Sequence, residues 1–129
     1  EFVFKDMIEK ENLNSQICVE SRGTSDEELG NSIHSGTIFE LNKHHIPYTP
    51  RKAIQLVKDD YHNFDYFISA DSLNCRLMRN LFVHDNEFKI HRILDLLLIH
   101  PKYRVIDRYH HNALQLLLYL HNLAHLPYR

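Results

Sequence analysis

The chain contains two cysteines, the residue type most suited to act as a protein nucleophile. Cys18 stands in a β-branched run, Ile17–Ser21, and a free cysteine there behaves as a small core hydrophobe. Cys75 stands in the first turn of an expected helix that begins at Asp71. No arginine partner is evident for it, so a structural role is favoured. Two cysteines are too few for a disulfide framework and indicate a reducing compartment.

Histidines are the other chemistry-bearing residues, and there are eleven of them. His121 and His125 are four residues apart on an expected helix, a spacing that can hold zinc. No glutamate stands between them and no third ligand is evident, so surface or packed histidines are the better interpretation. The same holds for the pairs His44-His45 and His110-His111, and we predict no metal site.

Length and composition limit the class of protein. The chain has 129 residues, 43% hydrophobic and 25% charged, as expected of one globular domain. Residues 1–88 carry nine basic and fifteen acidic side chains, whereas residues 89–129 carry six basic and two acidic ones and six of the histidines. The basic residues form no clustered run or nucleic-acid motif, and no apolar run of membrane-spanning length occurs. We therefore expect neither nucleic acid nor a membrane as a partner.

Periodicity places helices and strands in alternation. Helices are predicted over 2–11, over 33–43 with Asn31-Ser32 as the cap, and over 113–124. A further helix is predicted from Asp71-Ser72 onward, with Leu73, Leu77 and Leu81 on one face. Strands are predicted over 17–21 and 64–70, a helical turn near 58–61, and either a strand or a helix over 91–98. This alternation predicts an α/β domain with a mostly parallel sheet. Ligands in such folds bind beyond the carboxyl ends of strands, which directs attention to the loops 21–25 and 70–74.

Five segments, in one order, then resemble one enzyme family. They are Glu20-Ser21-Arg22-Gly23-Thr24-Ser25, Ile46-Pro47, Ala53-Ile54-Gln55-Leu56, Lys58-Asp59-Asp60-Tyr61 with Phe64-Asp65-Tyr66, and Ala70-Asp71-Ser72-Leu73-Asn74. Together they resemble the low-molecular-weight protein-tyrosine phosphatases, in particular the Gram-positive branch. The resemblance implies a Rossmann-like α/β fold, no metal or other cofactor, and hydrolysis of a phosphomonoester through a cysteinyl-phosphate.

That chemistry requires a loop of the form C-x5-R, whose thiolate attacks phosphorus while the arginine and backbone amides hold the phosphoryl oxygens. The sixth residue after Cys18 is Thr24 and the sixth after Cys75 is Leu81, so the printed sequence contains no such loop. Glu1-Phe2-Val3-Phe4 resembles the helix that follows the loop in the family. We therefore expect a single truncated domain over 1–129 without the first strand and phosphate loop, and no covalent phosphatase activity from the chain as given.

Five residues carry the roles that the resemblance implies. Asp107 corresponds to the general acid and Tyr109 to the aromatic wall beside the substrate, although Arg108 replaces the family proline between them. Ser21, Asp71 and Asn74 correspond to residues that support the phosphate loop. Because the chain contains no such loop, capping of a strand end is the simpler expectation for Ser21, and capping of its helix is the simpler expectation for Asp71.

Residues 95–129 diverge from the family pattern, through evolution or through an altered reading frame. Their leucine-rich segment 113–126 leaves self-association open. The prediction is a cytoplasmic phosphatase of phosphorylated proteins, inactive as given; the alternative is a non-catalytic, partner-binding protein of the same fold.

Overall fold

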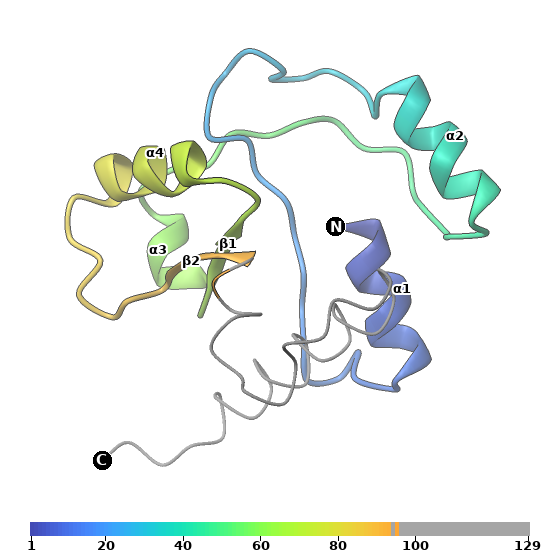
Figure 1. The fold of residues 1–129 in the computed structure, drawn as a ribbon, viewed down its shortest axis with the longest axis horizontal. Helices are drawn as coiled ribbons and strands as arrows, with labels where there is room; N and C mark the ends of the chain where they lie inside the picture. Colours follow the sequence, from blue (N-terminus) through green and yellow to red (C-terminus); the bar gives the residue numbers. More distant parts are fainter. Residues whose placement is uncertain (94, 96–129) are drawn as a thin grey trace.

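The computed structural model describes residues 1–93 and residue 95. Along this part of the chain lie α1 (Phe2–Lys10), α2 (Ser35–Lys43), α3 (Asp60–Asn63), β1 (Phe67–Ser69), α4 (Ser72–Phe82) and β2 (Ile90–Arg92) (Figure 1). Long extended segments connect α1 to α2 and α2 to α3, whereas α3 to β2 form a tight cluster. The helix predicted at the start of the chain is confirmed, with Ile8 as its buried residue.

The described sheet is a parallel pair. β1 pairs with β2 in the register Phe67 with Ile90 and Ser69 with Arg92, and the amide of Phe67 donates to the carbonyl of Lys89 at 2.8 Å. The crossover between the strands runs through α4, because parallel neighbours need a long connection. The strand expected over 64–70 is therefore confirmed over three of its residues. Ile68 between the two buried positions is 36% exposed, so this strand is not covered on both faces there.

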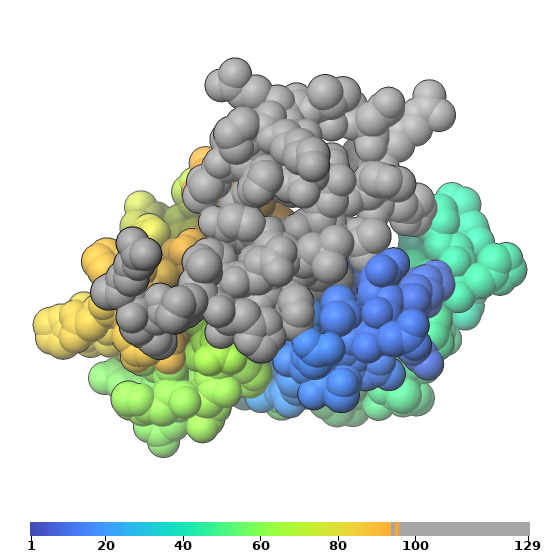
Figure 2. Space-filling model, turned by 90° about the horizontal axis from the view of Figure 1, so that it is seen from below, coloured from blue at the N-terminus to red at the C-terminus, as the bar shows by residue number. Residues whose placement is uncertain are grey.

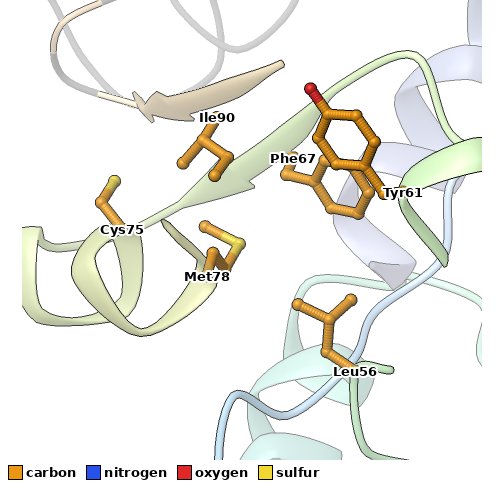
Figure 3. Close-up of a cluster of buried hydrophobic side chains, with 6 residues drawn as sticks. All are labelled: Leu56, Tyr61, Phe67, Cys75, Met78 and Ile90. Carbon is orange, nitrogen blue, oxygen red and sulfur yellow. The ribbon is translucent and has the colours of Figure 1, made fainter. Parts of the chain in front are cut away.

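The main hydrophobic core lies where α3 and α4 meet the two strands (Figure 3). Its buried members are Leu56, Tyr61, Phe67, Cys75, Met78 and Ile90. The buried face of α4 thus contains Cys75 and Met78, whereas Leu73, which we placed on the apolar face, is 53% exposed. The Sγ of Cys75 lies 2.9 Å from the hydroxyl of Ser69 at the end of β1, and this contact turns positions 75 and 78 of the helix toward the strands.

Residues 17–21 do not form the predicted strand. They are extended, but within the described part of the chain no strand pairs with them, and the first bridge is that of Gly23 with Gln55. Cys18 is correspondingly exposed, so its predicted core position is wrong. A β-branched run becomes a strand only where a neighbour supplies its hydrogen bonds, which local sequence does not specify.

The helix predicted from Ile33 begins at Ser35, with His34 as its N-cap. Asn31 and Ser32, the predicted caps, pair instead with the segment around Lys52 and Ala53. The carbonyl of Asn31 accepts from the amide of Ala53 at 2.8 Å, and Ser32 forms an antiparallel bridge with Lys52. Pairing with the 52–53 segment keeps residues 31–32 extended and delays the helix by two residues.

Tyr61 joins the core to the loop before β2. Its ring stacks on Phe67 at 6.0 Å, and its hydroxyl donates to the carboxylate of Asp85 at 2.8 Å. Burial raises the pKa of Tyr61 above its usual value near 10, and the carboxylate of Asp85 acts in the same direction. Because the folded state holds the phenolic proton more tightly than the unfolded state does, the stability that this proton contributes is present below pH 10 and is lost as the pH rises further.

We therefore expect the free energy of unfolding to fall less steeply above pH 10 in Tyr61→Phe than in the wild type. The variant will be less stable than the wild type at pH 7, because Asp85 loses a donor. The difference will narrow as the pH rises above 10. Urea unfolding followed by circular dichroism between pH 7 and 11 measures this, with Tyr48→Phe as the control. A constant difference across this range would contradict the prediction.

Candidate active-site region

A hollow of about 340 Å³ lies between the starts of α1 and α2. Its walls come from four segments that are distant in sequence: Glu1 and Phe2; Ser21, Arg22 and Gly23; Asn31, Ser32, Ile33 and Thr37; and Arg51, Ala53 and Ile54. Figure 1 shows the extended segment that follows α1 running beside it, and on the face shown in Figure 2 the blue N-terminal part of the chain lies against the teal part that contains α2. Two arginines, one carboxylate and several hydroxyl or amide groups share this surface with apolar side chains.

Ser21 is held at the hollow by two charged side chains. Glu1 Oε2 accepts from the Ser21 hydroxyl at 2.7 Å and from its backbone amide at 3.1 Å. Arg51 donates to the Ser21 hydroxyl at 3.2 Å and to its carbonyl at 3.1 Å. Arg51 and Glu1 also form an ion pair, and the Glu1 side chain is only 6% exposed. Ser21, Glu1 and Arg51, here called the serine clamp, fix the beginning of α1 against two extended segments.

Arg22, which also lines the hollow, connects the serine clamp to residues of other segments. Its guanidinium donates to the carbonyl of Ser21 at 3.2 Å and pairs with Glu20 at 2.5 Å. It also approaches Asp60 at 3.9 Å and stacks over the ring of Phe64 at 5.6 Å. Residues 17–22 have no described strand partner, so these side-chain contacts connect the segment to the core.

A second cluster lies at the carboxyl end of β1. Asp71 is the N-cap of α4, and its carboxylate accepts from the amide of Asn74 at 2.8 Å and from the Asn74 side chain at 3.1 Å. The side-chain oxygen Oδ1 of Asn74 in turn accepts from the hydroxyl of Thr24 at 2.5 Å. The loops 21–25 and 70–74 therefore meet, as the position of the two loops in an α/β fold predicts.

Arg92, at the end of β2, reaches the same cluster. It donates to the hydroxyl of Ser72 at 3.1 Å and pairs with Asp95 at 2.5 Å. The hydrogen bond and charge of Asp95 raise the pKa of Arg92, so the guanidinium is charged. The carboxyl ends of both strands thus carry polar side chains that face the first turn of α4.

The predicted site residues are divided among these places. Ser21 lines the hollow, whereas Asp71 and Asn74 form the second cluster outside its lining. Asp107 and Tyr109 lie outside the described residues, as does the segment 113–126. Glu1, Thr24 and Arg51 were not predicted as site residues, although Glu1 and Thr24 fall within the quoted motif segments and Arg51 lies two residues before the segment that begins at Ala53.

Within residues 1–93 and 95, no group of three or more histidine, cysteine, aspartate or glutamate side chains is arranged to hold a metal ion. The helices described there are also too short or too polar to cross a bilayer.

Comparison with known proteins identifies the family. Residues 1–113 match the family described as low molecular weight phosphotyrosine protein phosphatase. The chain belongs to this family. It is 32% identical over 95 residues to the low molecular weight protein-tyrosine-phosphatase YfkJ of Bacillus subtilis, which covers 74% of this chain and 61% of that relative. It is 43% identical over 60 residues to PtpA of Staphylococcus epidermidis, covering 46% of this chain and 38% of the relative.

Solved structures of the family share the fold. The crystal structure of YfkJ from Bacillus subtilis aligns with a TM-score of 0.79 and 26% identity over 98% of this chain and 86% of that one. The phosphatase SP-PTP from Streptococcus pyogenes aligns with a TM-score of 0.66 and 30% identity, over 95% and 75% of the two chains. The predicted Rossmann-like α/β class of a low-molecular-weight phosphatase is therefore confirmed. The chain spans about three fifths of the length of its YfkJ relative in the sequence comparison.

Removal of the side-chain cap of α4 tests whether Asp71 stabilises this helix in the chain. We expect Asp71→Ala to lower the free energy of unfolding by about 1 kcal/mol, because the variant leaves the Asn74 amide without its acceptor. Asp71→Ser retains a capping oxygen and serves as the control. Urea unfolding measures both variants; equal loss in the two would contradict a capping role.

Proposed function

We propose that this chain is part of a phosphatase that hydrolyses phosphomonoesters on proteins through a cysteinyl-phosphate, and that its 129 residues supply the supports of the catalytic loop rather than the nucleophile. The serine clamp is the observation that carries the proposal. Ser21, which by the family resemblance corresponds to a residue that supports the phosphate loop, lines the hollow at the beginning of α1 and is bonded there to Glu1, and this position supports the proposed role. A helix N-terminus at this place favours bound anions.

Neither cysteine of the chain fits the nucleophile's role. Cys75 is 4% exposed and lies against Ser69, and the sixth residue after it is Leu81 rather than arginine. Cys18 is exposed, but the sixth residue after it is Thr24. A thiolate without an arginine at this spacing lacks the charge that holds the phosphoryl oxygens in transfer.

The remaining roles follow the family pattern. Asp107 is proposed to protonate the leaving oxygen and then to deprotonate the attacking water, and Tyr109 to form the aromatic wall of the substrate cleft. The relatives' names support a phosphorylated protein as the substrate. We further propose that the protein acts in the cytoplasm, without a metal or other cofactor, and that it binds neither nucleic acid nor membranes.

An aryl-phosphate assay on the 129-residue chain tests the absence of the nucleophile. We expect no turnover above the blank, in the wild type and in Asp107→Asn alike. Turnover clearly above the blank that is lost in Asp107→Asn would contradict this part of the proposal.

The gene distinguishes a phosphatase from the alternative, a non-catalytic partner-binding protein. An in-frame Cys-x5-Arg-Ser-Pro upstream of Glu1, and aryl-phosphate turnover by the protein that includes it, is the result expected of a phosphatase. An open upstream frame without this motif would overturn the proposed activity and favour partner binding.

A further inference from the structure

Helix α2 has a histidine at each end. His34 is its N-cap and His44 its C-cap, and Leu41 is its one buried residue. The helix stands at the end of two extended segments, away from the sheet (Figure 1). A nine-residue helix is marginal in water by itself and depends on tertiary packing, which α2 provides through one buried residue, so the loss of a terminal hydrogen bond frays it easily.

The cap at the N-terminus depends on a neutral imidazole. His34 Nδ1 accepts from the backbone amide of Gly36 at 3.1 Å, while the His34 carbonyl accepts from the amide of Ile38 at 3.1 Å. Gly36 makes this possible, because a Cβ there would lie 3.1 Å from Nδ1 and 3.3 Å from Cε1 of the ring. The first turn holds no acidic residue.

A proton on Nδ1 would abolish this cap. The nitrogen that accepts from Gly36 would become a donor, and the imidazolium would face the positive end of the helix dipole. Imidazoles change charge between pH 5 and 8. Protonation of His34 therefore favours a frayed first turn.

The charged groups beside the residues that lead into α2 are engaged with other partners. Lys52 donates to the hydroxyl of Ser32 at 2.9 Å, and Glu28 accepts from the side-chain amide of Asn31 at 2.9 Å. The hollow contributes Arg22, Arg51 and the carboxylate of Glu1, which Arg51 already pairs. Among the described residues, no carboxylate forms an ion pair with His34.

His44 responds in the opposite sense at the other end of the helix. Its Nε2 lies 3.5 Å from Glu40 Oε2, an ion pair only when the ring is protonated, and a cation is favourable at a helix C-terminus. Lys43 also pairs with Glu40, at 3.2 Å. Acidification thus weakens the beginning of α2 and strengthens its end.

We propose that His34 is a pH-sensitive latch on the hollow: its protonation frays the first turn of α2 and loosens the wall formed by Ile33 and Thr37. The device concerns access to the hollow and stands whether or not the proposed phosphatase activity is correct.

Amide hydrogen exchange measured by NMR on the full chain tests the latch. From pH 8 to pH 5 we expect the protection factors of Gly36 and Ile38 to fall about fivefold, the effect of one lost cap. His34→Asn keeps a capping oxygen that does not titrate, and its protection should not change with pH. His44→Gln should retain the wild-type fall at Gly36.

Two outcomes would overturn the proposal. One is wild-type protection at Gly36 and Ile38 that stays constant from pH 8 to pH 5. The other is an equal fall in His34→Asn, which would assign the pH dependence to another group. The wild-type profile decides the first without any variant.

Discussion

Phe67→Ala is expected to cost about 3–5 kcal/mol of unfolding free energy, the range for a large-to-small change at a buried aromatic. Phe67 is 7% exposed and its ring lies 6.0 Å from Tyr61, 6.0 Å from Phe64 and 4.7 Å from Phe82. Truncation leaves a cavity that three rigid rings cannot fill. Because small domains have only about 5–15 kcal/mol of stability, this loss is a large fraction of the total.

Circular dichroism during urea unfolding measures the loss. Ile68→Ala, one residue along the same strand, is the matched control, because Ile68 is 36% exposed and points to the opposite face. That variant should lose at most about 1.5 kcal/mol. Similar losses at both positions would show that the core does not lie where the structure places it.

Arg51→Met is expected to cost about 1.5–3 kcal/mol of unfolding free energy, the range for hydrogen bonds to charged groups. The variant removes two donors from Ser21 and the guanidinium partner of Glu1, whose carboxylate is buried. Lys5 remains on Glu1 at 2.7 Å, which limits the loss. Since strand pairing does not hold residues 17–21, we expect α1 to detach before the core cluster unfolds.

A double-mutant cycle separates the ion pair from packing. The double variant Glu1→Gln with Arg51→Met should lose less unfolding free energy than the sum of the losses in the two single variants, because it leaves no buried charge without its partner. Lys52→Met, at the neighbouring exposed position, should change the free energy by less than about 0.5 kcal/mol. Strict additivity in the cycle would mean that Glu1 and Arg51 do not interact.

Several elements follow from local sequence. The apolar run before Ala70 predicts β1, and Asp71 followed by an apolar period predicts the capped helix α4. Both signals lie within a few residues of the element they specify, and for that reason they are readable. By contrast, the predictions of a strand over 17–21 and of a helix beginning at Ile33 were wrong. Segments 20 or more residues away decide whether the backbone there finds hydrogen-bond partners.

The residues of the candidate site likewise fall into those that sequence motifs predict and those that only the fold brings together. Ser21, Asp71 and Asn74 are found from ordered motifs, since a family's polar residues keep their sequence neighbours. Glu1 and Arg51 are 50 residues apart in the chain, and Thr24 and Asn74 are likewise 50 apart, yet each pair is in direct contact. No periodicity within either segment specifies such a contact.

The sequence by itself therefore determined the family, the α/β order of elements and the absence of a C-x5-R loop among the 129 residues. Only the tertiary structure decided which face of α4 is buried, that Cys18 is exposed, and that the serine clamp forms at the hollow. The reason is physical: residue type and spacing act over one or two turns of chain. Burial and ion pairing depend instead on which distant segments the fold brings together.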